Sequence, residues 1–151
     1  MLKEAGNLSG VIVFQNNNNS TTRKMTAFFN KQEIPYSTVK IGRNTFTYST
    51  FMKILSLTED GVDTILSTRS NIAQKMRDEG VDFGDLRLTE LYNLMMDNPT
   101  LLKTPIAVNF EDSRLTVGIE QDMLFKFLPP NYRKELMNQR LLDSAKSTNK
   151  R

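Results

Sequence analysis

Residues Val11–Met25 read VIVFQNNNNSTTRKM and carry the clearest structural signal in the chain. The first four residues, Val11–Phe14, are all apolar. The shortness of this run and its β-branched side chains predict a strand that is covered on both faces. Four consecutive asparagines follow, and the hydroxyl side chains of residues 20–22 can then cap a helix. The stretch therefore predicts a buried strand, a polar turn and a helix, which is a place where α/β proteins often keep their chemistry.

The elements on either side of this turn extend the prediction to a whole fold. Met25, Phe28 and Phe29 recur at i, i+3 and i+4, so the helix has one apolar face. A second strand is expected over 35–41. Later in the chain we expect a third strand over 104–110, its hairpin partner over 113–119 and a helix over 120–130. A β-α-β unit joined to a β-β-α unit is the thioredoxin-like plan.

Between the second and third strands the sequence has helical periodicity only. Tyr48, Phe51, Met52 and Leu55 recur at i, i+3, i+4 and i+7, which predicts one apolar helical face. We therefore expect an α/β, thioredoxin-like fold with a mixed four-stranded sheet and a helical insertion between strands 2 and 3. The expected single domain divides into a thioredoxin-like part over 10–45 and 100–130, the insertion over 46–98, and a basic C-terminal helix and tail over 131–151.

The composition excludes several classes of chemistry. The chain has 151 residues and a net charge of +3, but no cysteine and no histidine. Thiol redox chemistry, zinc sites built on cysteine or histidine, and Ser-His or Cys-His nucleophile pairs are therefore excluded within the chain. We expect no cofactor and no metal. The first ten residues are polar, and no apolar run approaches the roughly 18–20 residues of a membrane span, so neither a signal peptide nor a membrane segment is expected.

Several motifs resemble those of the Spx branch of the arsenate-reductase-like (ArsC) proteins. The most specific is LTEDGVDTILSTRS over Leu57–Ser70, and the supporting pieces are RKMTAFFNKQEIPY, LYNLMMDNPTLLKTPIAV, RLTVG and KFLPP. They occur in family-like order and spacing from Val11 to about Tyr132. The resemblance implies a cytoplasmic transcriptional regulator of Gram-positive bacteria, often of stress responses, that binds the C-terminal domain of the RNA polymerase α subunit. It implies contact with promoter DNA only within the polymerase complex, and no membrane partner.

The resemblance also implies roles for individual residues. Gly61 matches the glycine of the surface with which the family binds the α subunit, and the nearby Glu59, Asp60 and Asp63 could complement a basic patch there. Arg69 matches the arginine of the STR motif, which lies near the redox switch of the family. It can form a surface ion pair, organise the strand-to-helix turn, or contact a phosphate of promoter DNA. Arg114 matches the arginine that precedes the VG of the fourth strand.

The chain also departs from the family pattern. Many members carry a Cys-x-x-Cys switch at the start of the first helix, and here Asn19 and Thr22 occupy the two cysteine positions. We therefore expect a regulator without a thiol switch. We do not expect an enzyme, because neither side chain can replace a thiolate in arsenate reduction. Pro105 matches the proline that is cis in this fold and faces the turn, and Thr104 stands where the family often has an arginine.

The sequence leaves two interpretations of the turn open. It can be a solvated loop, because asparagine tolerates left-handed backbone and suits turns. It can also be an anion pocket, with the hydroxyls of Ser20, Thr21 and Thr22 as donors and with Arg69 and Arg114 adding charge. Two other functions stay open as well. One is an arsenate-reductase-like oxyanion-binding protein or thiol-dependent reductase relative, and the other is a passive adaptor that competes with related regulators for the polymerase.

Overall fold

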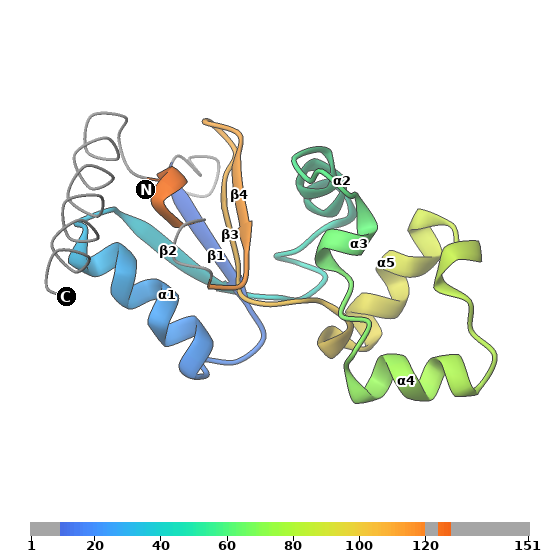
Figure 1. The fold of residues 1–151 in the computed structure, drawn as a ribbon. Coiled ribbons are helices and arrows are strands. Elements are labelled where there is room, and N and C mark those ends of the chain that lie inside the picture. Colours follow the sequence, from blue (N-terminus) through green and yellow to red (C-terminus); the bar gives the residue numbers. More distant parts are fainter. Residues whose placement is uncertain (1–9, 120–123, 128–151) are drawn as a thin grey trace, which may run out of the picture.

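The structure is a computed structural model that describes residues 10–119 and 124–127 (Figure 1). The strands are β1 (Val11–Gln15), β2 (Tyr36–Lys40), β3 (Ile106–Asn109) and β4 (Arg114–Val117). The α-helices are α1 (Ser20–Lys31), α2 (Tyr48–Ser56), α3 (Val62–Ile65), α4 (Asn71–Asp78) and α5 (Leu88–Asp97). The 3-10 helices are η1 (Phe83–Asp85), η2 (Pro99–Leu101) and η3 (Phe125–Phe127). The C-terminal helix and tail expected over 131–151 lie outside the described residues.

The four strands form one mixed sheet in the order β2-β1-β3-β4. Strand β1 runs parallel to β2 and antiparallel to β3, and β3 runs antiparallel to β4. Helices α2 to α5 lie in the chain between β2 and β3 (Figure 1). The predicted α/β fold with a mixed four-stranded sheet and a helical insertion is confirmed. Among the described residues, no helix has the length and apolar character that crossing a bilayer requires.

Strand β1 is covered on both faces, as its sequence predicts. Val11 and Val13 belong to a core cluster with the buried face of α1, whereas Ile12 and Phe14 belong to a second cluster with the helical insertion. This division follows from the alternation of side chains along a strand. Figure 1 shows the same arrangement, with α1 on one side of the sheet and α2 to α5 on the other.

Helix α2 buries a different face from the predicted one. Its buried residues are Phe51 and Ile54, whereas Tyr48 and Met52 are 36% and 38% exposed. The prediction of the buried face of this helix is therefore wrong in part. The apolar stripe of α2 is wider than its contact with the core, so packing against the rest of the insertion decides which edge of the stripe meets solvent.

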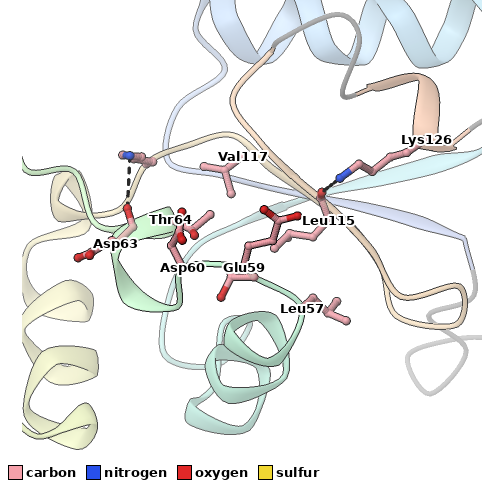
Figure 2. A pocket seen from close by; sticks show the side chains of 10 residues that line it. Leu57, Glu59, Asp60, Asp63, Thr64, Leu115, Val117 and Lys126 are labelled. Carbon is pink, nitrogen blue, oxygen red and sulfur yellow. Dashed lines mark hydrogen bonds between the residues drawn. The ribbon is translucent and has the colours of Figure 1, made fainter.

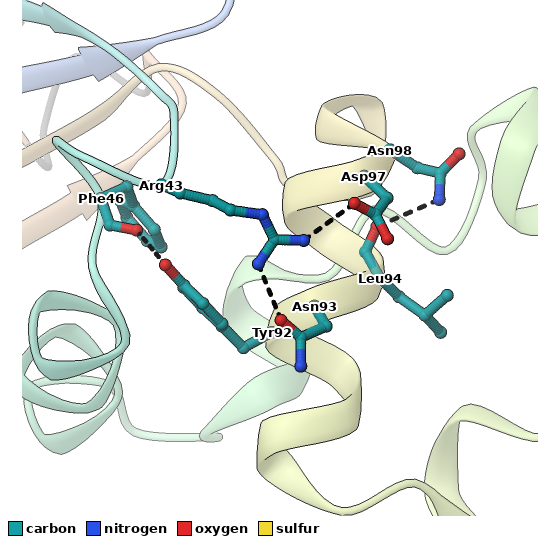
Figure 3. A network of polar contacts seen from close by, with 7 residues as sticks. All are labelled: Arg43, Phe46, Tyr92, Asn93, Leu94, Asp97 and Asn98. Carbon is teal, nitrogen blue, oxygen red and sulfur yellow. Dashed lines mark hydrogen bonds and ion pairs between the residues drawn. The ribbon is translucent and has the colours of Figure 1, made fainter.

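Polar contacts tie the insertion to the segment that leaves the sheet after β2 (Figure 3). The Arg43 guanidinium donates to Asn93 Oδ1 at 2.7 Å and to Asp97 Oδ1 at 2.8 Å, and both partners lie on α5. The Tyr92 hydroxyl of α5 donates to the Phe46 carbonyl at 2.7 Å. The Arg43 contacts are exposed to solvent and the Tyr92 bond is buried, so we expect the Tyr92 bond to stabilise this junction more.

Candidate functional site

The asparagine-rich turn is closed by its own side chains. Asn19 is the N-cap of α1, and its Oδ1 accepts a hydrogen bond from the Thr22 backbone N–H at 3.0 Å. Thr22 is only 1% exposed, and its hydroxyl donates to the Asn17 carbonyl at 3.2 Å. The expectation that a hydroxyl of residues 20–22 caps the helix is wrong. The helix begins at residue 20, so the free N–H groups of its first turn lie within reach of the Asn19 carboxamide.

Replacing Asn19 by alanine is expected to lower the free energy of unfolding by about 0.5–2 kcal/mol, because α1 loses its N-cap acceptor. Urea unfolding of the purified protein measures the change. Ser20→Ala is the matched control, since Ser20 is exposed and its side chain makes no hydrogen bond within the described residues. We expect the control to change stability by no more than about 0.5 kcal/mol. Equal losses in the two variants would contradict the assignment of the cap.

A pocket of about 450 Å³ lies beside this turn. Its polar lining residues are Asn16, Asn17, Asn19, Ser67, Thr100, Lys103 and Thr104. An antiparallel bridge between Leu66 and Leu102 brings together the two segments that carry Ser67 and Lys103, and the Lys103 N–H donates to the Ile65 carbonyl at 2.8 Å. The peptide bond between Thr104 and Pro105 is cis, the isomer that the resemblance implies.

The structure does not bring the two predicted arginines into this pocket. Arg114 begins β4, whereas Gly118, just beyond the other end of that strand, lines the pocket. At about 3.4 Å per residue the two positions are on the order of 13 Å apart. The expectation that Arg114 adds charge to the turn is therefore wrong. Arg69 is exposed and makes no hydrogen bond or ion pair within the described residues, and neither Ser20 nor Thr21 lines the pocket.

The cation that does line the pocket is Lys103, which the sequence alone does not single out. It lies next to Thr104, the position at which the family often has an arginine. A basic residue beside that position is the feature of the sequence that could have indicated Lys103. A single lysine and the amides of an asparagine-rich turn give the pocket a polar, weakly basic wall. None of its described lining residues is a cysteine, histidine, aspartate or glutamate.

A second candidate surface is the Gly61 loop, which we define as residues 58–61 between α2 and α3. Gly61 has a φ of +64° and a ψ of −132°, a conformation that glycine adopts far more readily than other residues. A Cβ built on Gly61 would meet no atom within 4 Å, so the space in front of it is open. Glu59 and Asp60 are exposed, and their carboxylates make no hydrogen bond or ion pair within the described residues. Another chain can therefore approach the backbone closely here and complement two carboxylates with positive charge.

A second pocket, of about 470 Å³, lies between the Gly61 loop and β4 (Figure 2). Glu59 and Asp60 line it from the loop, and Leu115 lines it from β4. Lys126 of η3 closes one end, where its Nζ donates to the Leu115 carbonyl at 2.6 Å. Burial lowers the pKa of Lys126, because the ammonium loses hydration, and the nearby Glu59 carboxylate opposes this shift.

The chain is similar to known regulators over most of its length. The sequence profile of the ArsC family matches residues 14–127. The global transcriptional regulator Spx of Staphylococcus epidermidis is 38% identical over 135 residues, which cover 88% of this chain and 99% of the relative. The global transcriptional regulator Spx of Streptococcus mutans is 33% identical over 129 residues, which cover 85% of this chain and 90% of the relative.

Solved structures share the fold. An arsenate reductase from Vibrio cholerae superposes with a TM-score of 0.62 at 18% identity, covering 80% of this chain and 99% of that one. A Staphylococcus aureus protein solved by NMR superposes with a TM-score of 0.63 at 20% identity, covering 77% of this chain and 96% of that one. These two solved structures share the thioredoxin-like architecture that the sequence predicts for this chain.

Proposed function

Because the chain belongs to the ArsC family and is similar to Spx regulators over most of its length, we propose that it is a transcriptional regulator that binds the C-terminal domain of the RNA polymerase α subunit. Bound there, it changes which promoters the polymerase uses, and it meets promoter DNA only within the polymerase complex. It works without a thiol redox switch, since the chain contains no cysteine.

The Gly61 loop supports this function most strongly. The loop lies inside the LTEDG segment that resembles Spx, and it combines open space at Gly61 with a free, exposed carboxylate at Asp60. The α-subunit domain approaches the backbone at Gly61, and basic side chains of that domain meet Asp60. The positive φ of Gly61 also allows the chain to enter α3, so the same glycine serves the turn and the contact.

The strand-to-helix turn supports control by something other than thiol oxidation. The hydrogen bond from the Thr22 N–H to Asn19 Oδ1 joins the two positions at which many Spx-like proteins carry cysteines. Thr22 is also buried and bonded to Asn17, so the turn keeps its capped shape without a sulfur atom. The activity of the protein is then set by its abundance or by another input. Arsenate reduction by a thiolate of its own is impossible for this chain.

Binding to the α-subunit domain is expected to be insensitive to diamide, because the protein has no thiol to oxidise. Calorimetric titration of the untreated α-subunit domain with protein that has or has not been exposed to diamide measures this. We expect saturable binding with the same Kd in both cases. Diamide is a better probe than peroxide, since the eight methionines can form sulfoxides.

A cysteine-containing Spx treated in parallel shows that the diamide reaction is effective. Loss of binding after diamide, in the cysteine-free chain, would contradict thiol-independent action. In vitro transcription with reconstituted polymerase then measures promoter use. Altered promoter output supports a regulator, whereas displacement of another Spx without altered output would favour a passive adaptor.

A further inference from the structure

We propose that Lys126 is a positioning residue for the Gly61 loop. Its ammonium attracts the Glu59 carboxylate toward β4 and so fixes the loop that carries the exposed Asp60 and Gly61. The proposal deepens the proposed function and rests on it, because the Gly61 loop is the surface that meets the polymerase. It divides the carboxylates that the sequence groups together. Asp60 contacts the partner, and Glu59 holds the loop in place.

Lys126 is fixed on its own side of the pocket. Leu124, two residues before it, is 3% exposed in the core shared with α1. Phe127, the next residue, packs its ring edge-on against Phe29 of α1, with 5.5 Å between the ring centroids. Between these two anchors the Lys126 Nζ donates to the Leu115 carbonyl at 2.6 Å. The ammonium therefore sits at a defined point on the edge of the sheet.

Glu59 faces this ammonium from the other side of the pocket. Figure 2 shows the Glu59 carboxylate on the side of the loop nearest β4, whereas the Asp63 carboxylate points away from β4. Glu59 and Lys126 line the same pocket, and the two charges attract across it. Two other cations lie nearby: Lys103 donates to the Asp63 carbonyl at 3.5 Å, and Arg114 acts on Lys126 as a like charge that lowers its pKa. Lys126 is thus placed to hold Glu59.

This attraction spans two parts of the molecule. Lys126 follows β4 at the end of the thioredoxin-like part, and Glu59 lies between α2 and α3 in the insertion. Gly61 has no side chain, and the Asp60 side chain has no hydrogen-bond partner within the described residues. Glu59 and Asp60 both line the pocket, and Glu59 is the carboxylate whose charge acts on Lys126 across it. A charge at the end of the sheet thereby influences the orientation of the partner surface.

A double-mutant cycle tests the proposal on the full chain. Lys126→Met, Glu59→Gln and the double variant are titrated against the purified α-subunit domain. We expect each single variant to bind about threefold to tenfold more weakly, and the double variant to bind no more weakly than either one. Lys126→Arg is expected to restore binding, since arginine keeps the charge and can still donate to Leu115. Lys40→Met is the matched control, because Lys40 is exposed on β2 at the opposite edge of the sheet.

Amide hydrogen exchange of the Gly61 loop gives a readout that needs no partner. In Lys126→Met, the amides of residues 58–61 are expected to exchange faster than in wild type. The free energy of global unfolding is not expected to fall, because methionine removes a desolvated charge. If wild type does not bind the α-subunit domain, the proposed function fails, and exchange still tests the role of Lys126. Exchange and affinity equal to those of Lys40→Met, or additive losses in the double variant, would overturn the proposal.

Discussion

Replacing Phe46 by alanine is expected to lower the free energy of unfolding by about 3–5 kcal/mol. Phe46 is fully buried in the segment that joins β2 to α2. Its ring packs edge-on against Phe14 of β1, with 5.3 Å between centroids, and against Phe51 of α2 at 6.4 Å. Its carbonyl also accepts the Tyr92 hydroxyl of α5. The variant leaves a cavity where the sheet, α2 and α5 meet, and single domains have only about 5–15 kcal/mol in total.

Urea unfolding followed by circular dichroism measures this loss. Met52→Ala is the matched control, since Met52 lies on α2 but is 38% exposed. We expect the control to cost no more than about 0.5 kcal/mol. A loss below about 1 kcal/mol for Phe46→Ala would mean that the junction between sheet and insertion is not the packed core that the structure shows.

Reversing the charge of Asp60 is expected to weaken binding to the α-subunit domain at least about tenfold, because a like charge then faces the basic patch of the partner. Asp60→Lys is a cleaner test than Gly61→Arg. Any side chain at Gly61 also strains a backbone with a φ of +64°, so loss of binding there could reflect a distorted turn. Asp60 is exposed and is not among the described residues with positive φ.

Asp85→Lys is the matched control for this substitution. It makes the same change of charge at an exposed position of η1 in the same insertion, away from the Gly61 loop. Calorimetry with each purified variant and the α-subunit domain gives the two Kd values, and thermal unfolding confirms that both variants are folded. Equal affinities for Asp60→Lys and Asp85→Lys would remove Asp60 from the contact.

The fold could be predicted from the sequence because its main signals are local. The apolar run Val11–Phe14 specifies a strand with two buried faces, and the polar turn after it separates that strand from an amphipathic helix. The choice of N-cap could not be predicted as well. Asn19 and the hydroxyl residues 20–22 are all competent caps, and the position at which the backbone enters the helix decides between them.

The candidate site was predicted less completely because its parts come from distant segments. Lys103 follows the bridge between Leu66 and Leu102 and lines the pocket beside the turn, and Lys126 lines the pocket between β4 and the Gly61 loop. No local sequence pattern predicts the position of either lysine. The position of Arg114, by contrast, could have been predicted from the hairpin that the sequence indicates. A strand that runs antiparallel to β3 must begin at the end of the sheet away from the turn.

Titration of ¹⁵N-labelled protein with the unlabelled C-terminal domain of the α subunit shows whether the two bind and through which residues. The proposed function predicts saturable amide shifts that are largest in residues 58–63, with an endpoint at one domain per chain. The same spectra recorded after diamide treatment should superpose on the untreated series. No shift at excess domain, or shifts confined to α1 on the opposite face and β2 at the opposite edge of the sheet, would contradict a polymerase contact through the Gly61 loop.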